Sequence, residues 1–516
     1  MSSSAPSPTP DPSTTPQPRP FRHRWAFLGI ISLGLLMISL DNSILFTALP
    51  VLEDELSTTP NQALWVINAY PLVLSGLLLG TGTLGDRIGH RRMFLLGLTI
   101  FGYSSLAAAY APTPGLLIAT RALLGMGAAV MMPATLALIR ATFDDDRERS
   151  TAMGLWGSTG VVGAAAGPIL GGWLLEHFWW GSVFLINVPL CALGIVATVL
   201  FAPPNHTDSA SYWDIVSSLL SLVALSGLTL TIKEATNPDR STVVLCIAAA
   251  ASATAAVFFV RRQRTLSHPL LTFDLFRNRI FVGGVLAAGG AMIAVSGMEL
   301  LTTQNLQVVN GFSPLEAGLT LASVTVCAFP LSILGGMYLH RVGFLPLIGG
   351  GFCAVAIGMA VAVWATHLDF FPGLIVGLMI LGVGAGSVMS VSSIAIIDAA
   401  PPHRSGMAAG VEEVSYEFGS LIAVATAGSL HTAIAISRYR AHADANGIDA
   451  SADVFAGIKN PATAMVAGDA LTGAYTATLS CLAVTAVLLA AATGWCFRGN
   501  PKKATASATA TASRGR

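Results

Sequence analysis

The sequence predicts an all-α membrane protein that crosses the bilayer many times, with two related six-helix halves and two further helices inserted between them. Only 10% of its 516 residues are charged and 53% are hydrophobic, whereas soluble domains carry about 25% charged residues. The chain contains fourteen apolar runs of about the length that crosses a bilayer. Short motifs recur along it at a nearly constant distance. These observations exclude a soluble enzyme.

The predicted spans divide the chain into domains. The N-terminal half covers 25–202, the inserted helices 203–260, and the C-terminal half 261–495, which includes a long outer loop at 431–469. The ends, 1–24 and 496–516, are predicted to be disordered because Pro, Ser, Thr and Ala dominate them. The fourteen spans are 25–48, 62–81, 93–111, 115–138, 151–175, 182–202, 214–232, 242–260, 280–304, 315–338, 345–364, 371–393, 407–430 and 471–495.

Charge and cysteine patterns set the orientation and exclude several partners. Most Lys and Arg fall in loops on one side of the predicted spans, which places both termini in the cytoplasm. The 27 basic and 27 acidic residues cancel, which gives no support to a nucleic-acid partner. The six cysteines lack metal-ligand spacing, so we expect no metal and no cofactor. Asp214 begins the seventh span and is predicted to be its N-cap.

Internal repeats relate the two halves. GTLGDRIG at 82–89 corresponds to GMYLHRVG at 336–343, and LGMGAAVMM at 124–132 corresponds to LGVGAGSVM at 381–389. The members of these two pairs are 254 and 257 residues apart, and the Arg-Ser pairs before the fifth and thirteenth spans are 255 residues apart. Spans 1–6 and 9–14 are therefore two copies of one unit. Parallel repeats of this kind are typical of transporters with a site between the halves.

Five motifs also resemble a known family. GTLGDRIGHRR (82–92) resembles the signature loop of the major facilitator superfamily, and LDNSILFTALP (40–50) resembles the first-helix motif of its fourteen-helix drug:proton antiporter branch. RALLGMGAA (121–129) and GAAAGPILGG (163–172) are similar to the fourth-helix and antiporter motifs, and VEEVSYEFG (411–419) to a stretch of the disinfectant and quaternary-ammonium multidrug efflux pumps. The resemblance runs from about residue 25 to 495 and implies proton-coupled drug export.

The 82–92 loop is the candidate gating element. Its glycines permit a tight turn, and Asp86 can cap a helix or pair with an arginine. The resemblance implies that the loop holds the halves together on the cytoplasmic side; the alternative is a positive loop that only fixes topology. In the second copy His340 stands where Asp86 would fall, so only the first copy is expected to make the full contact. The candidate residues are Gly82, Gly85, Asp86, Arg87, Gly89, Arg91 and Arg92.

The fifth span carries small residues at a spacing of four around a proline. Such residues let another helix approach closely, and a proline removes one backbone donor and bends its helix. Ordinary membrane helix packing is the alternative; in the resembled family this stretch marks exporters. A glycine-rich phosphate site is excluded, because no Lys-Ser/Thr follows. The residues are Gly163, Gly167, Pro168, Gly171 and Gly172.

Two ionisable residues inside spans are candidates for proton coupling. Asp41 and Arg121 each lie about six residues from the outer end of a span, so both are about 9 Å deep and share one layer. Ionisable residues in spans are costly and usually functional. A structural ion pair is the alternative. The resemblance places both residues in the proton-linked machinery.

Four carboxyl groups are candidates for substrate binding. Glu413 and Glu417 are four residues apart and share one helix face, and Glu412 faces elsewhere. Buried carboxyls in an apolar cavity attract lipophilic cations, and the resemblance implies drug contact at Glu413 and Glu417. An interfacial stretch outside the bilayer is the alternative. Glu299, near the outer end of the ninth span, is a further candidate or an interfacial carboxylate.

The sequence therefore predicts an exporter of the bacterial plasma membrane that exchanges lipophilic small-molecule drugs, mainly cations, for protons, and that works as a monomer in the lipid bilayer. The absence of a Walker motif indicates that the membrane potential and the pH gradient supply the energy. Export of a self-made antibiotic or metabolite is the alternative within transport. Solute uptake fits the antiporter motif poorly, and a membrane enzyme or receptor would need a nucleophile–base pair or metal cluster.

Overall fold

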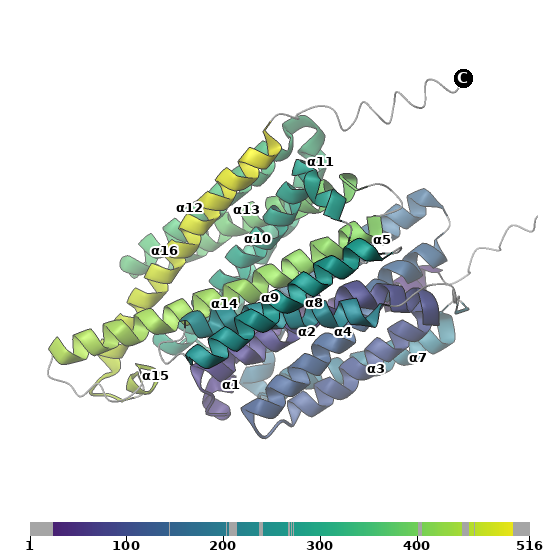
Figure 1. Cartoon of the computed structure of the whole chain (residues 1–516). Coiled ribbons are helices and arrows are strands. Elements are labelled where there is room, and N and C mark those ends of the chain that lie inside the picture. The colour runs from purple at the N-terminus through teal and green to yellow at the C-terminus, as the bar shows by residue number, and fades with distance from the viewer. Residues whose placement is uncertain are drawn as a thin grey trace, which may run out of the picture.

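The structure is a computed structural model that describes residues 24–498 apart from 144, 203, 206–213, 237–240, 267–268, 270, 272, 401–404, 446–453 and 459. This part of the chain contains helices and no strand (Figure 1). The predicted disordered ends lie almost wholly outside it. The helices are α1 (Arg24–Glu55), α2 (Pro60–Ile88), α3 (His90–Ala109), α4 (Pro114–Thr142), α5 (Asp146–His177), α6 (Ser182–Leu185), α7 (Asn187–Phe201), α8 (Ile215–Thr236), α9 (Thr242–Thr265), η2 (Phe273–Arg277), α10 (Arg279–Gln304), η3 (Asn305–Val309), α11 (Pro314–Val342), α12 (Phe344–His367), α13 (Phe371–Asp398), α14 (Ser405–Ala445), α15 (Val454–Gly457) and α16 (Ala464–Phe497).

The predicted apolar runs coincide with these helices, and the run at 182–202 is divided between α6 and α7. Within the described residues, twelve helical spans are long and apolar enough to cross a membrane, and thirteen if the bent α5 is counted as one span. The count of fourteen is therefore not confirmed.

The two halves repeat one set of helix contacts. In the N-half (α1–α7), α1 packs on α5 and α7, and α4 packs on α2 and α3. In the C-half (α10–α16), α10 packs on α14 and α16, and α13 packs on α11 and α12. Each C-half helix thus takes the place of its N-half counterpart, which confirms the architecture that the repeats predict. Figure 1 shows α12, α13 and α16 grouped apart from α3, α4 and α7.

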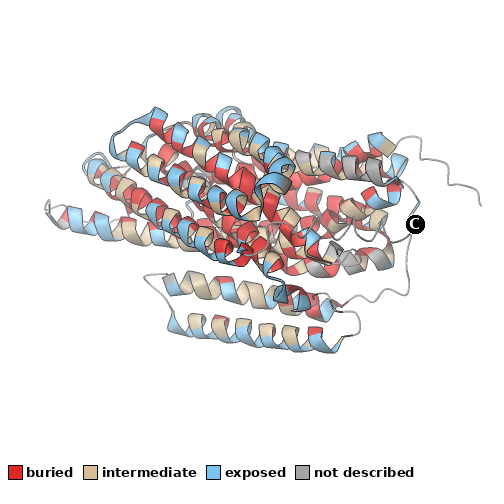
Figure 2. Cartoon of the chain, turned by 90° about the horizontal axis from the view of Figure 1, so that it is seen from above, coloured by how far each residue is buried: buried red, intermediate tan, exposed pale blue. Residues whose placement is uncertain are grey.

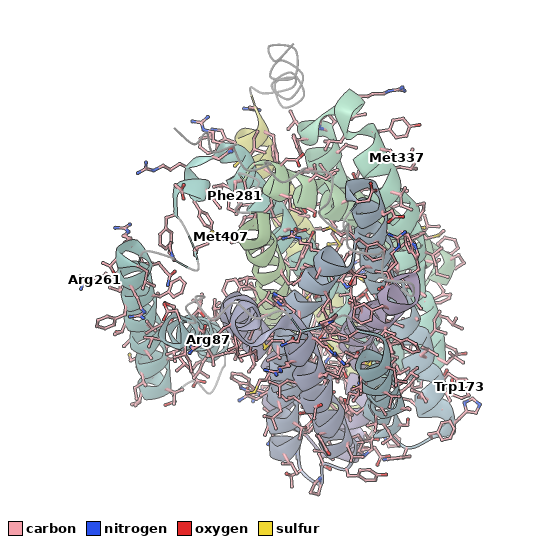
Figure 3. All side chains as sticks on the ribbon, turned by 90° about the vertical axis from the view of Figure 1, so that its right-hand side faces the viewer. Arg87, Trp173, Arg261, Phe281, Met337 and Met407 are labelled. Carbon is pink, nitrogen blue, oxygen red and sulfur yellow. The ribbon has the colours of Figure 1, made fainter. Side chains whose placement is uncertain are left out.

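Two equivalent contacts join the halves. In each, the fifth helix of one half packs on the second helix of the other: α5 packs on α11, and α14 packs on α2. We call the end of the bundle at which α1 ends and α2 begins the distal end, and the opposite end the proximal end; Figure 3 views the latter, with Arg87 and Arg261 labelled. The closest approaches lie distally. A Cβ on Gly428 of α14 would lie 2.5 Å from Leu64 of α2, and the Gln307 amide donates to the Thr47 carbonyl at 2.8 Å.

Prolines inside α4 and α5 free backbone carbonyls that neighbouring helices then satisfy. Pro168 has no N–H for the carbonyl of Ala164, four residues earlier; the Ser43 hydroxyl of α1 donates to that carbonyl at 2.8 Å. In α4, Pro133 stands in the same relation to Ala129, whose carbonyl accepts from Thr81 of α2 at 2.6 Å. α5 bends by 41° at the same place. The prolines thus fix helix pairs as well as bends.

The inserted α8 and α9 form a hairpin at the edge of the bundle, visible as the separate pair of helices at the bottom of Figure 2. Only α8 packs on the bundle, against α2 and α14, and the Ser221 hydroxyl donates to the Gly76 carbonyl at 2.7 Å. α9 exposes large apolar side chains such as Val243 and Ile247, which suit contact with lipid. The hairpin therefore lies over the line where the two halves meet.

Asp214 organises the base of the hairpin. Its carboxylate accepts from the backbone N–H of Ser217 at 3.1 Å, which confirms the predicted N-cap, and from the Arg262 guanidinium of α9 at 2.9 Å. Burial raises the pKa of Asp214, but the hydrogen bonds from Arg262 and Ser217 outweigh it and hold that pKa below its usual range. The pair joins α8 to α9.

The prediction of a long outer loop at 431–469 is largely wrong. α14 continues to Ala445 and α16 begins at Ala464, so helix covers both ends of the range and α15 lies between them. Hydropathy marks where a helix leaves the bilayer, not where it ends; residues 431–445 are rich in Ala and other good helix formers and extend α14 beyond the apolar run.

Candidate functional site

The N-half contains a buried ion pair between α1 and α4. Asp41 is 2% exposed and Arg121 is fully buried, and the guanidinium Nη1 donates to Asp41 Oδ2. Asn187, the first residue of α7, donates from Nδ2 to the other carboxylate oxygen at 2.9 Å. The sequence places Asp41 and Arg121 in one layer, and the structure brings them into contact. Both oxygens of Asp41 are thus engaged.

α2 completes the surroundings of Arg121. The guanidinium Nε donates to the Val66 carbonyl at 3.2 Å, and the group lies 4.7 Å from the centroid of the Tyr70 ring. A Cβ on Gly125 would lie 2.4 Å from the Tyr70 carbonyl, so this glycine lets α4 approach α2. Nη2 of Arg121 has no hydrogen-bond partner among the described residues. One donor of the buried cation is therefore free for another acceptor.

The C-half contributes carboxyl groups from α14. Glu417 is 8% exposed and Glu413 is partly buried. Glu417 lies within electrostatic reach of Arg121, and Tyr70 lies within reach of Asp41, Arg121, Glu417 and Glu413. The structure thus gathers one cation and three carboxyls from both halves around Tyr70. We call Asp41, Arg121, Glu413 and Glu417 the central site.

The remaining predicted acids lie apart from these contacts. Glu412 is hydrogen-bonded to Ser393 of α13 and to Tyr416, so it faces the neighbouring helix of its own half. Glu299 is partly buried on α10. No described contact joins Glu299 to the central site. Glu412 and Glu299 are therefore not part of the proposed binding site.

The glycines predicted in α5 lie at two helix contacts. Cβ atoms on Gly163 and Gly167 would lie 2.8 Å from the Leu36 carbonyl and 2.5 Å from Ser43 Cβ, both on α1. Gly171 faces Ile44 of the same helix. The motif therefore brings α5 against the helix that carries Asp41.

Gly172 and Pro168 instead contact the other half. A Cβ on Gly172 would lie 2.4 Å from Leu315 Cα, and one on Gly318 of α11 would lie 2.1 Å from the Pro168 carbonyl. The opposing atoms are backbone and cannot move away cheaply. This contact closes the distal end between the halves.

We expect Gly172→Ala to weaken this contact, because its methyl group has no space. The variant should lower the free energy of unfolding by about 1–3 kcal/mol, as overpacking does, and should slow transport by disturbing distal closure. Gly350→Ala is the matched control, because no atom lies within 4 Å of its Cβ position. Thermal unfolding of the purified protein and transport rates measure both effects. Equal behaviour of the two variants would contradict the close contact.

The 82–92 loop is described in part; the side chains of Gly82, Asp86 and His340 lie outside the described residues. Gly85 is buried in the last turns of α2, Arg87 is exposed, and Arg91 donates to the Val199 carbonyl at 2.9 Å. Asn205 donates to the Ile88 carbonyl at 2.9 Å and accepts from the Arg92 backbone N–H. Gly89 has φ +94°, which favours glycine. These contacts join the loop to α7 and to Asn205 just after it.

Sequence reasoning missed Asn187, Tyr70 and Asn205. Asn187 was visible as the single amide within the apolar run LINVPL. Tyr70 gave no signal, because aromatic residues are common in spans. Asn205 follows α7 in the sequence and meets the 82–92 loop only through the fold. No cluster of three or more His, Cys, Asp or Glu suited to a metal occurs among the described residues.

Apolar helices in two related halves, with ionisable groups buried between them, define a secondary transporter. The chain belongs to the Major Facilitator Superfamily, whose family model matches residues 31–309 and 280–440.

Curated relatives extend over most of the chain. The methyl viologen resistance protein SmvA of Salmonella typhimurium is 38% identical over 79% of this chain and 82% of its own length. The multidrug efflux pump LfrA of Mycolicibacterium smegmatis is 35% identical over 81% and 82%. The methylenomycin A resistance protein of Streptomyces coelicolor is 29% identical over 77% and 83%.

A solved structure shares the fold. A bacterial homologue of the human lysosomal transporter Spinster, crystallised in an inward-facing and unoccupied conformation, matches with a TM-score of 0.64 and 16% identity, over 92% of this chain and 98% of its own.

Proposed function

We propose that the protein is a proton-coupled antiporter that exports lipophilic, mainly cationic drugs across the bacterial plasma membrane. The observation that carries this proposal is the central site, where Arg121 pairs with Asp41 of its own half and lies within electrostatic reach of Glu417 of the other. The relatives named as multidrug and methyl viologen resistance proteins support drug export. Both termini would lie in the cytoplasm, and the monomer would be the working unit.

Coupling follows from the cost of burying charge. A carboxylate away from water must be neutralised by a proton, a cation or an ion pair. At Glu413 and Glu417 a proton and an organic cation therefore compete. A drug that binds from the cytoplasm releases protons there, and protons that enter from outside release the drug.

Arg121 would link this competition to the two halves. Protonation of Asp41 removes the negative partner of the Arg121 guanidinium. Nη2 of Arg121, which has no hydrogen-bond partner among the described residues, can then turn to Glu417. An ion pair within the N-half would thus exchange for one between the halves. Such an exchange gives the two conformations different energies, as a coupled transporter requires.

The 82–92 loop is proposed as the cytoplasmic gate. Asp86 would hold the halves together when the proximal end closes, and its counterpart His340 would contribute less. The described contacts of Arg91 and Asn205 support a rigid loop, which such a gate needs. Export of an antibiotic is the second candidate function, favoured by the relative named for methylenomycin A resistance.

Transport into proteoliposomes tests the proposal. We expect methyl viologen to accumulate in vesicles with an acidic interior, because outward proton flow drives inward drug movement through an antiporter. Methyl viologen carries fixed charges and is not a weak base, so acid trapping cannot mimic the result. Protein-free vesicles and vesicles with collapsed pH gradients serve as controls. Uptake that does not depend on the pH gradient would contradict antiport.

A further inference from the structure

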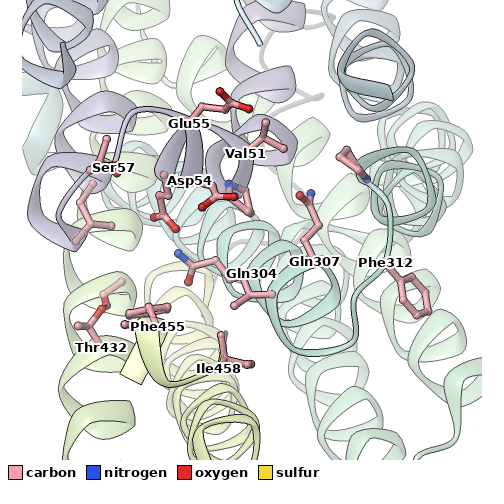
Figure 4. A pocket seen from close by; sticks show the side chains of 18 residues that line it. Val51, Asp54, Glu55, Ser57, Gln304, Gln307, Phe312, Thr432, Phe455 and Ile458 are labelled. Carbon is pink, nitrogen blue, oxygen red and sulfur yellow. The ribbon is translucent and has the colours of Figure 1, made fainter. Parts of the chain in front are cut away.

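A cavity of about 630 Å³ lies at the distal end between the two halves. The end of α1, the start of α2, α10 with η3, α14 and α15 all line it, and Figure 4 shows it from close by. Its volume falls within the range of sites for drug-sized molecules, about 300–1,000 Å³. The central site lies elsewhere, because none of its residues lines this cavity.

The lining has the charge and shape for an organic cation. Glu53, Asp54 and Glu55 contribute three carboxyls from consecutive positions of α1, and no Lys or Arg lines the cavity. Phe312 and Phe455 add aromatic rings, which attract cations and pack against apolar groups. No group of acids suited to a metal occurs among the described residues, which favours an organic cation over a metal ion.

Buried amides independently indicate a ligand. Gln304 is 9% exposed, its side chain points into the cavity between Asp54 and Phe455 in Figure 4, and its amide makes no hydrogen bond within the described chain. Gln304 and Phe455 also line a smaller pocket with Asn305 and His431.

These two neighbours have unpaired atoms as well. Asn305 is 6% exposed and His431 3%, and neither Asn305 Nδ2 nor His431 Nδ1 has a partner in the described residues. Buried polar atoms without partners are costly, but the small pocket at these two residues has no room for a water molecule, so a ligand would be held at Gln304 in the larger cavity instead.

The cavity lies on the route from the central site to the distal side. Glu53 is twelve residues beyond Asp41 on α1, and Gly428 is eleven beyond Glu417 on α14, so the cavity is about 16–18 Å further along both helices. Leu64 and Gly428, which form the distal contact between α2 and α14, also line it. Parting of that contact would connect the two sites.

We propose that this distal cavity is a second binding site for the exported organic cation, which occupies it after leaving the central site. This inference rests on the proposed function and adds a release site to it. Glu53, Asp54 and Glu55 attract the cation, Phe312 and Phe455 contact its apolar part, and Gln304 positions it. The closed α2–α14 contact keeps the cation from returning.

Equilibrium binding of ethidium, a fluorescent lipophilic monocation, to the purified full-length protein in lipid nanodiscs tests the site. We expect two bound ethidium ions per unmodified protein. The variant Glu53→Gln/Asp54→Asn/Glu55→Gln should lower the affinity for one of them about tenfold or more, because three carboxyl groups near the ligand are lost. Glu413→Gln/Glu417→Gln should lower the affinity for the other ethidium ion. Asp369→Asn, which neutralises an exposed distal acid away from the cavity, should change neither.

Phe455→Ala provides an independent variant if the triple substitution fails to fold, because it alters only a side chain of the short α15. It should also lower the affinity for the ethidium ion in the distal cavity. If both distal variants bind two ethidium ions as tightly as the unmodified protein does, the inference is overturned.

The same assay separates this failure from that of the proposed function. Suppose that the unmodified protein transports methyl viologen but binds a single ethidium ion, and that the Glu413→Gln/Glu417→Gln variant no longer binds it. This result would overturn the distal site and leave the proposed function standing. Absence of any bound cation, together with absence of transport, would overturn both.

Discussion

Asp41→Asn should abolish proton-driven export while the protein still reaches the membrane. The substitution keeps the shape of the side chain, and its one amide oxygen can still accept from Arg121, but it removes the group that takes up and releases the proton. With no proton to take up or release at this position, no proton-dependent exchange of the partners of Arg121 remains. Transport of methyl viologen into proteoliposomes with an acidic interior should fall to the protein-free level.

The stability of variants at the ion pair separates coupling from folding. Arg121→Ala strands the Asp41 carboxylate and should cost about 3–5 kcal/mol, as removal of one partner of a buried pair does. Asp41→Asn combined with Arg121→Gln leaves neither charge and should recover much of that stability without recovering transport. Transport by the double variant at the unmodified rate would reduce the pair to a structural role.

The Glu413→Gln/Glu417→Gln variant should bind cations far more weakly. Both carboxyls lie on one face of α14 within reach of Tyr70, and Coulomb attraction grows with ligand charge. Loss of both charges should cost about 1.4–3 kcal/mol for a monocation, or roughly 10- to 150-fold in affinity, and more for the dication methyl viologen. Competition of methyl viologen with ethidium at the central site measures both affinities.

Glu412→Gln is the matched control for this variant. It removes the same charge from the adjacent position of the same helix, but Glu412 is bonded to Ser393 and Tyr416 and faces α13. We expect its effect on cation affinity to be several-fold smaller. Equal losses in the two variants would show that only the net charge of α14 matters, and unchanged affinity in both would remove these acids from binding.

The sequence alone predicted the repeat architecture and the common depth of Asp41 and Arg121. Both follow from positions along helices: the repeats from fixed offsets, and the common depth from equal distances to the outer ends of spans of opposite direction. The shared face of Glu413 and Glu417 follows from helix periodicity in the same way.

Contacts that depend on how helices are placed around one another could not be predicted. Asn187 reaches Asp41 because the chain breaks between α6 and α7, and Tyr70 lies under Arg121 because Gly125 lets α2 approach. The distal cavity also depends on α14, which continues beyond the apolar run and brings Thr432 and α15 over the end of α1. His431, at the edge of a predicted span, is buried in the same way.

Proton release on drug binding tests most directly the claim that protons and cations compete for one buried carboxyl network. Methyl viologen would be added to the purified protein in weakly buffered solution, with a pH-sensitive dye as the reporter. We expect net proton release that saturates with drug binding and is reduced in the Glu413→Gln/Glu417→Gln variant at equal occupancy. Saturable drug binding by the unmodified protein without any proton release would contradict it.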